Sequence, residues 1–242
     1  MRGLRIVSVV LCLWALVPVG RAADDEATEA FHAAVAAAYR HYREAVHYHE
    51  TGNAELADLA LDQFVADWKA LAARYAEKAP PGYAKDEAFA ETLAAIEGKA
   101  ASAVGSAPAE ALLALRPIRA DLAALRKRSG QQSFSDCVDA MNEAMSGLYL
   151  YFQRRTMLDL ARPRAVAEFR AAAARAEAPY RRCRDEAPAA HRESPEFRRL
   201  FEGALASFAR LAEFLEARDE QQLYNTLGEL RSFDKLIWLR FG

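Results

Sequence analysis

The sequence has few of the residues from which β-sheets are built. After residue 22 it contains only 14 β-branched residues: six Val, three Ile and five Thr. Strands are enriched in such residues, so this scarcity excludes an architecture based on sheets. Alanine, the strongest helix former, instead supplies 54 of the 242 residues. The chain is therefore predicted to be all-α.

Long hydrophobic runs are lacking after the first residues of the chain. Arg2 and Arg5 precede an apolar stretch over residues 6–19, and Gly20-Arg21-Ala22 places small residues where signal peptidase reads them. This pattern predicts a secretory signal cleaved after Ala22, with an uncleaved N-terminal anchor as the alternative. No later stretch approaches the ~20 apolar residues of a membrane span. The mature protein is therefore expected to be periplasmic or secreted, with no membrane contact after cleavage.

The sequence has no excess of charge of either sign. It carries 32 Lys and Arg against 34 Asp and Glu, a formal net charge of -2. Loss of the three arginines in residues 1–22 would bring the mature chain to about -5. A general nucleic-acid binder would carry a basic patch, so nucleic acid is not expected as a partner.

Cysteine is also scarce, with three residues in the chain. Cys12 lies within the predicted signal, which leaves Cys137 and Cys183 in the mature protein. An exported pair is most often a disulfide. Cys137 starts one predicted helix and Cys183 ends the next, and antiparallel neighbours bring such ends together. Catalytic or metal-binding thiols are the alternative, although the sequence contains no CxxC motif.

Start and stop signals of helices predict eight helices. Their approximate ranges are 24–50, 54–78, 86–104, 108–128, 135–159, 163–184, 195–217 and 220–240. Pro117 and Pro179 fall inside two of these ranges, where proline is expected to kink the helix.

The eight helices form two sets of four whose sequences match at a drifting offset. Leu115 and Arg119 coincide with Leu227 and Arg231 at an offset of 112 residues. Such a pattern is typical of a diverged internal duplication. Four helices of this length with short connections suit an antiparallel bundle. The sequence thus predicts two tandem four-helix bundles: a signal over 1–22, a first bundle over 23–131 and a second over 132–242. A tetratricopeptide-like spacing within residues 48–61 is the alternative.

Motifs of enzyme chemistry are missing from the sequence. It contains no Gly-rich phosphate loop, no GxSxG and no HExxH, so no enzyme and no cofactor are predicted. Four of the five histidines lie between residues 32 and 49. By helical orientation, His49 falls within the apolar stripe of its helix and His32 on the border of the stripe. These two are the better ligand candidates, which keeps a haem- or metal-binding bundle open as the alternative.

The last helix carries the most distinctive string, Leu230 to Gly242. Asp234 projects close to the inner stripe of this helix, and an inward carboxylate needs a partner. Arg231 is the nearest in sequence, and an arginine of another helix is equally suitable. Asp234, Arg231 and Trp238 are therefore candidates for a ligand or partner contact.

The four-helix units resemble cytochrome b562/c′-like exported bundles in size and topology. The sequence departs from that family where haem chemistry resides, because residues 108–128 and 220–240 contain neither CxxCH nor histidine. The strings at 135–142 and 230–236 look like those of a group of uncharacterised exported bacterial proteins. This resemblance implies a periplasmic location and does not indicate any activity.

These observations together predict a periplasmic, non-enzymatic helical-bundle protein that binds a protein partner or a small ligand. The alternative is a haem- or metal-binding bundle linked to electron transfer or metal handling.

Overall fold

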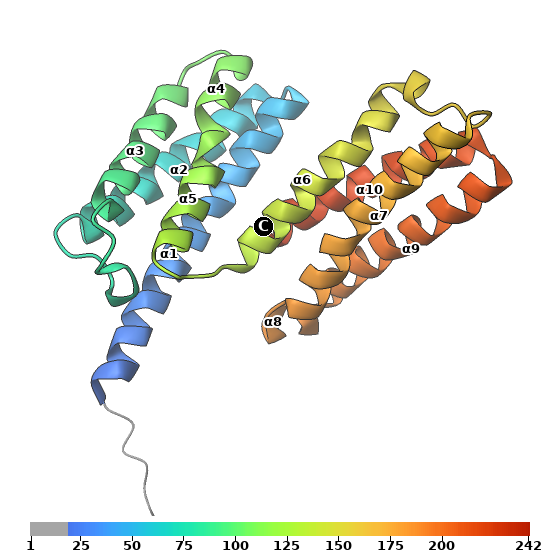
Figure 1. Cartoon of the computed structure of the whole chain (residues 1–242). Helices are drawn as coiled ribbons and strands as arrows, with labels where there is room; N and C mark the ends of the chain where they lie inside the picture. Colours follow the sequence, from blue (N-terminus) through green and yellow to red (C-terminus); the bar gives the residue numbers. More distant parts are fainter. Residues whose placement is uncertain (1–18) are drawn as a thin grey trace, which may run out of the picture.

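A computed structural model describes residues 19–242, with side chains from Asp25 onward, and this part of the chain is helical without any strand. Figure 1 shows the helices in two groups that diverge from a short linker. The predicted signal over residues 1–22 falls almost entirely outside the described residues. Among those residues, no helix is both long enough and apolar enough to span a membrane.

The N-terminal helix group covers the first half of the described chain. It comprises α1 (Val19–Thr51), α2 (Ala54–Tyr75), the 3-10 turn η1 (Pro81–Tyr83), α3 (Phe89–Ala103), α4 (Pro108–Leu115) and α5 (Pro117–Arg128). In this group α1 packs along α2 and α4, α2 packs on α3, and α3 contacts both α4 and α5. Fully buried Trp68 donates its indole N–H to the carbonyl of Leu93 at 3.0 Å, which ties α2 to α3.

The C-terminal helix group follows the linker at residues 129–133. It comprises α6 (Phe134–Gln153), the 3-10 turn η2 (Arg155–Met157), α7 (Pro163–Glu186), α8 (Ala189–Glu193), α9 (Pro195–Ala217) and α10 (Glu220–Phe241). Here α6 packs on α7 and α10, and α9 packs on the same two helices. Tyr180 is fully buried between Phe201 and Phe208, with its ring centre 5.2 Å from that of Phe208.

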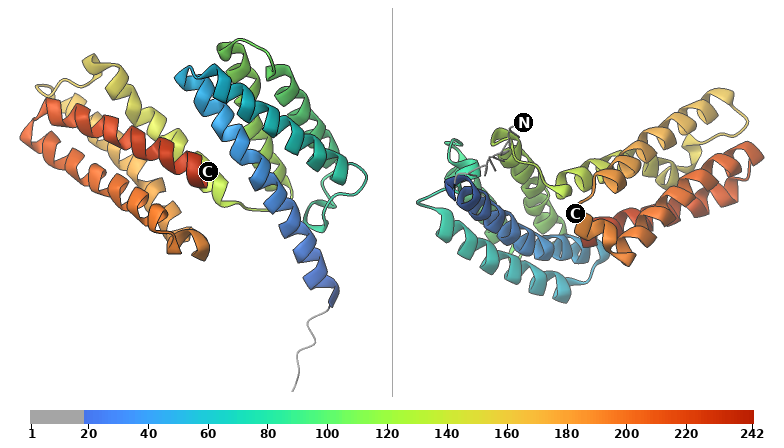
Figure 2. Two further views of the ribbon diagram at one scale, coloured as in Figure 1. Left: turned by 180° about the vertical axis from the view of Figure 1, so that it is seen from behind. Right: turned by 90° about the horizontal axis from the view of Figure 1, so that it is seen from below.

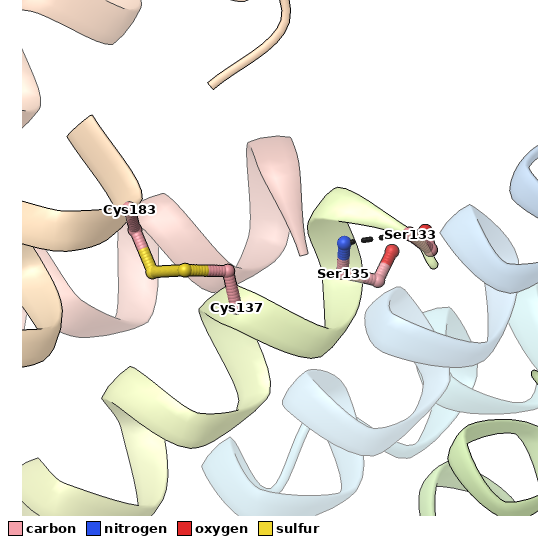
Figure 3. Close-up of a disulfide and its surroundings, with 4 residues drawn as sticks. All are labelled: Ser133, Ser135, Cys137 and Cys183. Atoms are coloured by element: carbon pink, nitrogen blue, oxygen red, sulfur yellow. Dashed lines mark hydrogen bonds between the residues drawn. A yellow bond between two sulfur atoms is a disulfide. The ribbon is translucent and has the colours of Figure 1, made fainter. Parts of the chain in front are cut away.

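The start of α6 is fixed by a cap and by a covalent bond. Ser133 and Asp136 form a capping box that satisfies free amides of the first helical turn. The Ser133 hydroxyl accepts the amide of Ser135 at 3.3 Å, as Figure 3 shows. In the same view, Cys137 on α6 and Cys183 on α7 have their sulfurs 2.05 Å apart and their Cα atoms 5.7 Å apart. The predicted pair is thus at disulfide distance.

Most predicted helices recur within a few residues of their predicted bounds, with three differences. The predicted helix 108–128 is interrupted before Pro117, which has no N–H to continue the hydrogen-bond ladder, although Arg116 keeps helical dihedrals (φ -53°, ψ -38°). The helix predicted over 135–159 ends at Gln153, because Arg154 leaves the helical region (φ -119°, ψ 76°). A short helix, α8, was not predicted. Pro179 lies within α7, which continues to Glu186.

The two groups meet along the C-terminal part of α1 and α10, which are in contact. Buried Arg43 on α1 donates its Nε–H to the carbonyl of Leu239 at 3.3 Å. The linker contains Gly130 at φ +65°, a left-handed conformation that glycine adopts without strain. Figure 2 shows from two sides that the groups diverge away from this junction.

Candidate functional site

A cleft of about 1240 Å³ lies between the two helix groups. Its lining comes from α1, α5, the linker, α6 and α10, so neither group forms it alone. The floor is formed by residues of α1 and α10: Tyr42, Val46, Glu50, Arg231, Asp234, Lys235 and Trp238. Sites that bind small molecules are typically concave and occur often where two domains or helix bundles meet.

The walls of the cleft are α5 on one side and α6 on the other, and they carry opposite charges. The α5 wall presents Arg116, Arg119 and Lys127, with small side chains between them. The α6 wall presents Asp136, Asp139, Asn142, Glu143 and Ser146. A cationic wall therefore faces a predominantly acidic one across the cleft.

Ion pairs bridge the two walls near the linker. Arg126, which lies behind the α5 wall, donates to both carboxylate oxygens of Asp136 at 2.9 and 2.5 Å. Further along, Arg119 Nη2 lies 2.6 Å from Asp139 Oδ1, an ion pair whose geometry is not that of a linear hydrogen bond. The pair lies largely out of solvent, since the two side chains are 27% and 16% exposed.

Asp234 is the most deeply buried acid of the site, at 3% exposure. Its Oδ1 accepts the Tyr180 hydroxyl at 2.7 Å, and its Oδ2 accepts the Asn142 side-chain amide at 2.6 Å. Burial raises the pKa of Asp234 to about 6, because desolvation outweighs these two hydrogen bonds, which favour the charged form.

A chain of polar contacts runs from Asp234 to the opposite wall. Asn142 donates to Asp234 and accepts from Arg119 Nη1 at 3.2 Å, and Arg119 in turn pairs with Asp139. The Arg119 guanidinium also lies 5.5 Å from the ring centre of Trp238 on the floor. Burial raises the pKa of Asp139, although Arg119 opposes this shift. Arg119 of the N-terminal group is thus the centre of a network that otherwise belongs to the C-terminal group.

Two buried donors on the floor have no hydrogen-bond partner. Tyr42 is fully buried and Trp238 is 5% exposed, and neither the Tyr42 hydroxyl nor the Trp238 indole N–H is bonded. Burial keeps the pKa of Tyr42 well above its ordinary value, so the hydroxyl is protonated at neutral pH. Buried polar groups are nearly always hydrogen-bonded in proteins, so both atoms retain the capacity to donate to an acceptor that reaches them.

The structure brings together three of the five contact residues expected from the sequence. Asp234, Arg231 and Trp238 all line the cleft. The prediction that Asp234 pairs with an arginine is wrong, since the carboxylate oxygens of Asp234 accept hydrogen bonds from a phenol and an amide. Arg231 instead lies over the Tyr149 ring, with its guanidinium carbon 4.0 Å from the ring centre.

Neither of the two histidine candidates is among the residues that line the cleft. His32 is hydrogen-bonded through Nε2 to the Tyr83 hydroxyl at 2.9 Å, and burial lowers its pKa. His49 is 6% exposed near the end of α1, and both of its ring nitrogens lack a partner. Among the described residues, no three or more His, Cys, Asp or Glu side chains are grouped so that they could hold a metal ion.

Sequence reasoning did not identify Tyr42, Arg119, Asp139 or Asn142 as site residues. Tyr42 belongs to the apolar stripe of its helix and therefore looked like a core residue. Arg119 carried a signal, because the repeat alignment pairs it with Arg231, and both arginines line the cleft.

No protein-family model matches the chain, and no curated protein and no solved structure matches it either. The resemblance to exported four-helix bundles therefore stays a prediction.

Proposed function

We propose that this chain is an exported, non-enzymatic binding protein that takes up a small ligand in the cleft between its two helix groups. The observation that carries the proposal is the pair of unbonded donors on the cleft floor, Tyr42 and Trp238. Both belong to a cleft that has opposite charges on its two walls. A ligand with acceptor groups would remove the cost of leaving these donors unpaired.

We further propose that the two helix groups are tandem four-helix bundles that arose by duplication. The supporting observation is that residues paired by the sequence repeat have the same burial. Phe64 and Phe169 are both fully buried, and so are Ile118 and Leu230. In this alignment the cleft lies between equivalent helices, with α1 corresponding to α6 and α5 to α10.

Binding fits the cleft better than catalysis because its buried carboxylates are engaged by other side chains. Asp139 is paired with Arg119, and both oxygens of Asp234 accept hydrogen bonds. Neither histidine nor cysteine is among the described residues of the lining. A nucleophile with an adjacent general base, as acyl-transfer enzymes require, would have to come from elsewhere.

The test is native mass spectrometry of protein prepared from a bacterial periplasm and exposed to a small-molecule library. Export predicts a mature chain that begins at Ala23. Ala123→Trp, which places an indole in the cleft, should abolish any retained ligand. Ala124→Trp is the matched control, since Ala124 is exposed on the same helix and does not line the cleft.

Two outcomes would reject the proposal. One is the absence of any bound compound, and the other is binding that Ala123→Trp and Ala124→Trp affect equally. An absorption spectrum and a metal analysis of the same material test the haem- or metal-binding alternative, which predicts a Soret band or stoichiometric metal.

A further inference from the structure

Most of the charged side chains around the cleft have a partner within the protein. Asp136 binds Arg126, Asp139 binds Arg119, and Glu50 lies 3.6 Å from both Arg116 and Lys235. Arg231 lies on the Tyr149 ring, and Asp234 is held by Tyr180 and Asn142. Arg231 thus has a ring contact but no anionic partner, and of the other charged residues that line the described cleft this leaves one cation, Lys127, and one acid, Glu143. The side chains of both residues are exposed and form neither an ion pair nor a hydrogen bond.

Lys127 and Glu143 lie on opposite walls and at different positions along the length of the cleft. Lys127 follows Arg126, which pairs with Asp136, so it lies near the linker end. Glu143 lies seven residues after Asp136 on α6, further from the linker. Since α5 runs toward the linker and α6 runs away from it (Figure 1), the two charges are separated along the cleft. At a rise of 1.5 Å per helical residue, the component of this separation along α6 is about 10 Å, and the width of the cleft adds to it.

From this arrangement we propose that the ligand of the cleft is a short peptide, or another zwitterion with its ammonium and carboxylate at least about 10 Å apart. The ammonium faces Glu143, and the carboxylate faces Lys127. An extended chain of three residues spans at most about 10 Å, so a tripeptide is the shortest peptide that reaches between the two charges.

The floor between these charges suits the backbone of such a peptide. Tyr42 and Trp238 belong to the lining, and their buried donor atoms have no acceptor within the protein. Val46 and the Trp238 ring offer apolar contact to its side chains. The inference rests on the proposed function and adds the chemical class of the ligand.

The test uses a pool of tripeptides built from Gly, Ala, Leu and Phe, in four forms: free, N-acetylated, C-amidated and capped at both ends. Binding to the full mature chain is measured by native mass spectrometry and calorimetry. Free peptides should bind, either single cap should weaken binding roughly five-fold, as loss of one partly exposed ion pair predicts, and doubly capped peptides should bind weakest.

Charge variants assign each end of the peptide to its wall. In Glu143→Gln, N-acetylation of the peptide should no longer weaken binding, whereas C-amidation should weaken binding as it does in the unaltered protein. Lys127→Gln should do the reverse. Glu216→Gln on α9 and Lys69→Gln on α2, both exposed and outside the cleft, are the controls and should preserve both responses.

Failure of this inference and failure of the proposed function are distinguishable. If the tripeptides do not bind while another compound binds and is lost in Ala123→Trp, the peptide inference is wrong and the cleft is still a binding site. The inference is equally wrong if tripeptides bind but the two charge variants respond to the caps as the unaltered protein does. If nothing binds in a manner sensitive to Ala123→Trp, both are wrong.

Discussion

At the scale of single residues, Asp234 shows how burial turns an ordinary carboxyl group into a pH-sensitive one. The side chain is almost completely buried, and its hydrogen bonds come from the neutral donors Tyr180 and Asn142. Two neutral donors compensate for desolvation less well than an ion pair would. The pKa of Asp234 therefore lies near 6 in the folded chain, against about 4 in an unfolded one.

This difference fixes the direction of a pH effect on stability. Between pH 4 and 6 the folded state holds a proton on Asp234 that the unfolded state has lost, so stability falls as the pH rises through this range. The contribution is complete below pH 4, is lost above pH 6 and amounts to about 3 kcal/mol. Asp234→Asn does not titrate, so its stability relative to the unaltered protein should improve by that amount between pH 4 and 7.

Urea denaturation across that pH range measures the effect as a difference between the two proteins, which cancels the titration of other groups. Asp58→Asn, at an exposed position on α2, is the control and should follow the unaltered protein throughout. A difference between Asp234→Asn and the unaltered protein that stays constant with pH would contradict the raised pKa.

At the scale of the secondary-structure elements, two helical glycines differ in what surrounds them. A Cβ atom added at Gly203 on α9 would lie 2.5 Å from the Phe233 ring of α10, whereas one added at Gly98 on α3 meets nothing within 4 Å. Gly203→Ala should therefore destabilise the protein by ~1–3 kcal/mol through overpacking. Gly98→Ala should stabilise it by ~0.5–1 kcal/mol, because alanine favours the helix. Thermal unfolding of the two variants checks both signs, and a stabilised Gly203→Ala would show that α9 and α10 pack less closely.

The bond between α6 and α7 is a second test at this scale. It joins residues 46 apart in sequence, and in the chain-entropy model a loop of that size contributes roughly 3–4 kcal/mol. The double variant Cys137→Ala, Cys183→Ala should lose about that amount in a denaturant titration. Reductant should lower the stability of the unaltered protein and leave the double variant unchanged. Equal responses to reductant in the two proteins would argue against the disulfide.

The helices themselves could be predicted because their signals are local. Caps, prolines and glycines mark their ends, and the cysteine pairing followed from two neighbouring antiparallel helices. A kink was expected at both Pro117 and Pro179, yet only Pro117 interrupts the hydrogen-bond ladder of its helix. The sequence of a helix does not show whether the surrounding packing holds it continuous across a proline, so this difference could not be predicted.

At the scale of the whole molecule, the cleft could not be predicted, because a residue between two helix groups has the same periodicity as one in a core. Tyr42 fits the apolar stripe of α1 but lies on the cleft floor. Arg119 fits the polar side of its helix, but its contacts are with α6 and α10. Only the placement of the two groups gives these residues a common role.

Arg119 should therefore hold the two groups in their relative position. Arg119→Ala removes its contacts with Asp139, Asn142 and Trp238 and leaves the Asp139 carboxylate without a partner. The expected loss is about 2 kcal/mol, below that of a fully buried pair because both side chains retain some solvent exposure.

The more specific consequence of this variant concerns shape. Without this link the groups remain joined by the linker, by the Arg126–Asp136 pair and by the α1–α10 contact. Small-angle scattering should then show a larger radius of gyration with the helix content unchanged. Arg210→Ala is a suitable control, since Arg210 pairs with Glu229 inside the C-terminal group, and it should leave the radius unaltered. If Arg119→Ala lowers stability without expanding the molecule, the arginine acts within its local network only. The relative position of the two groups would then depend on the Arg126–Asp136 pair and on the contact of α1 with α10.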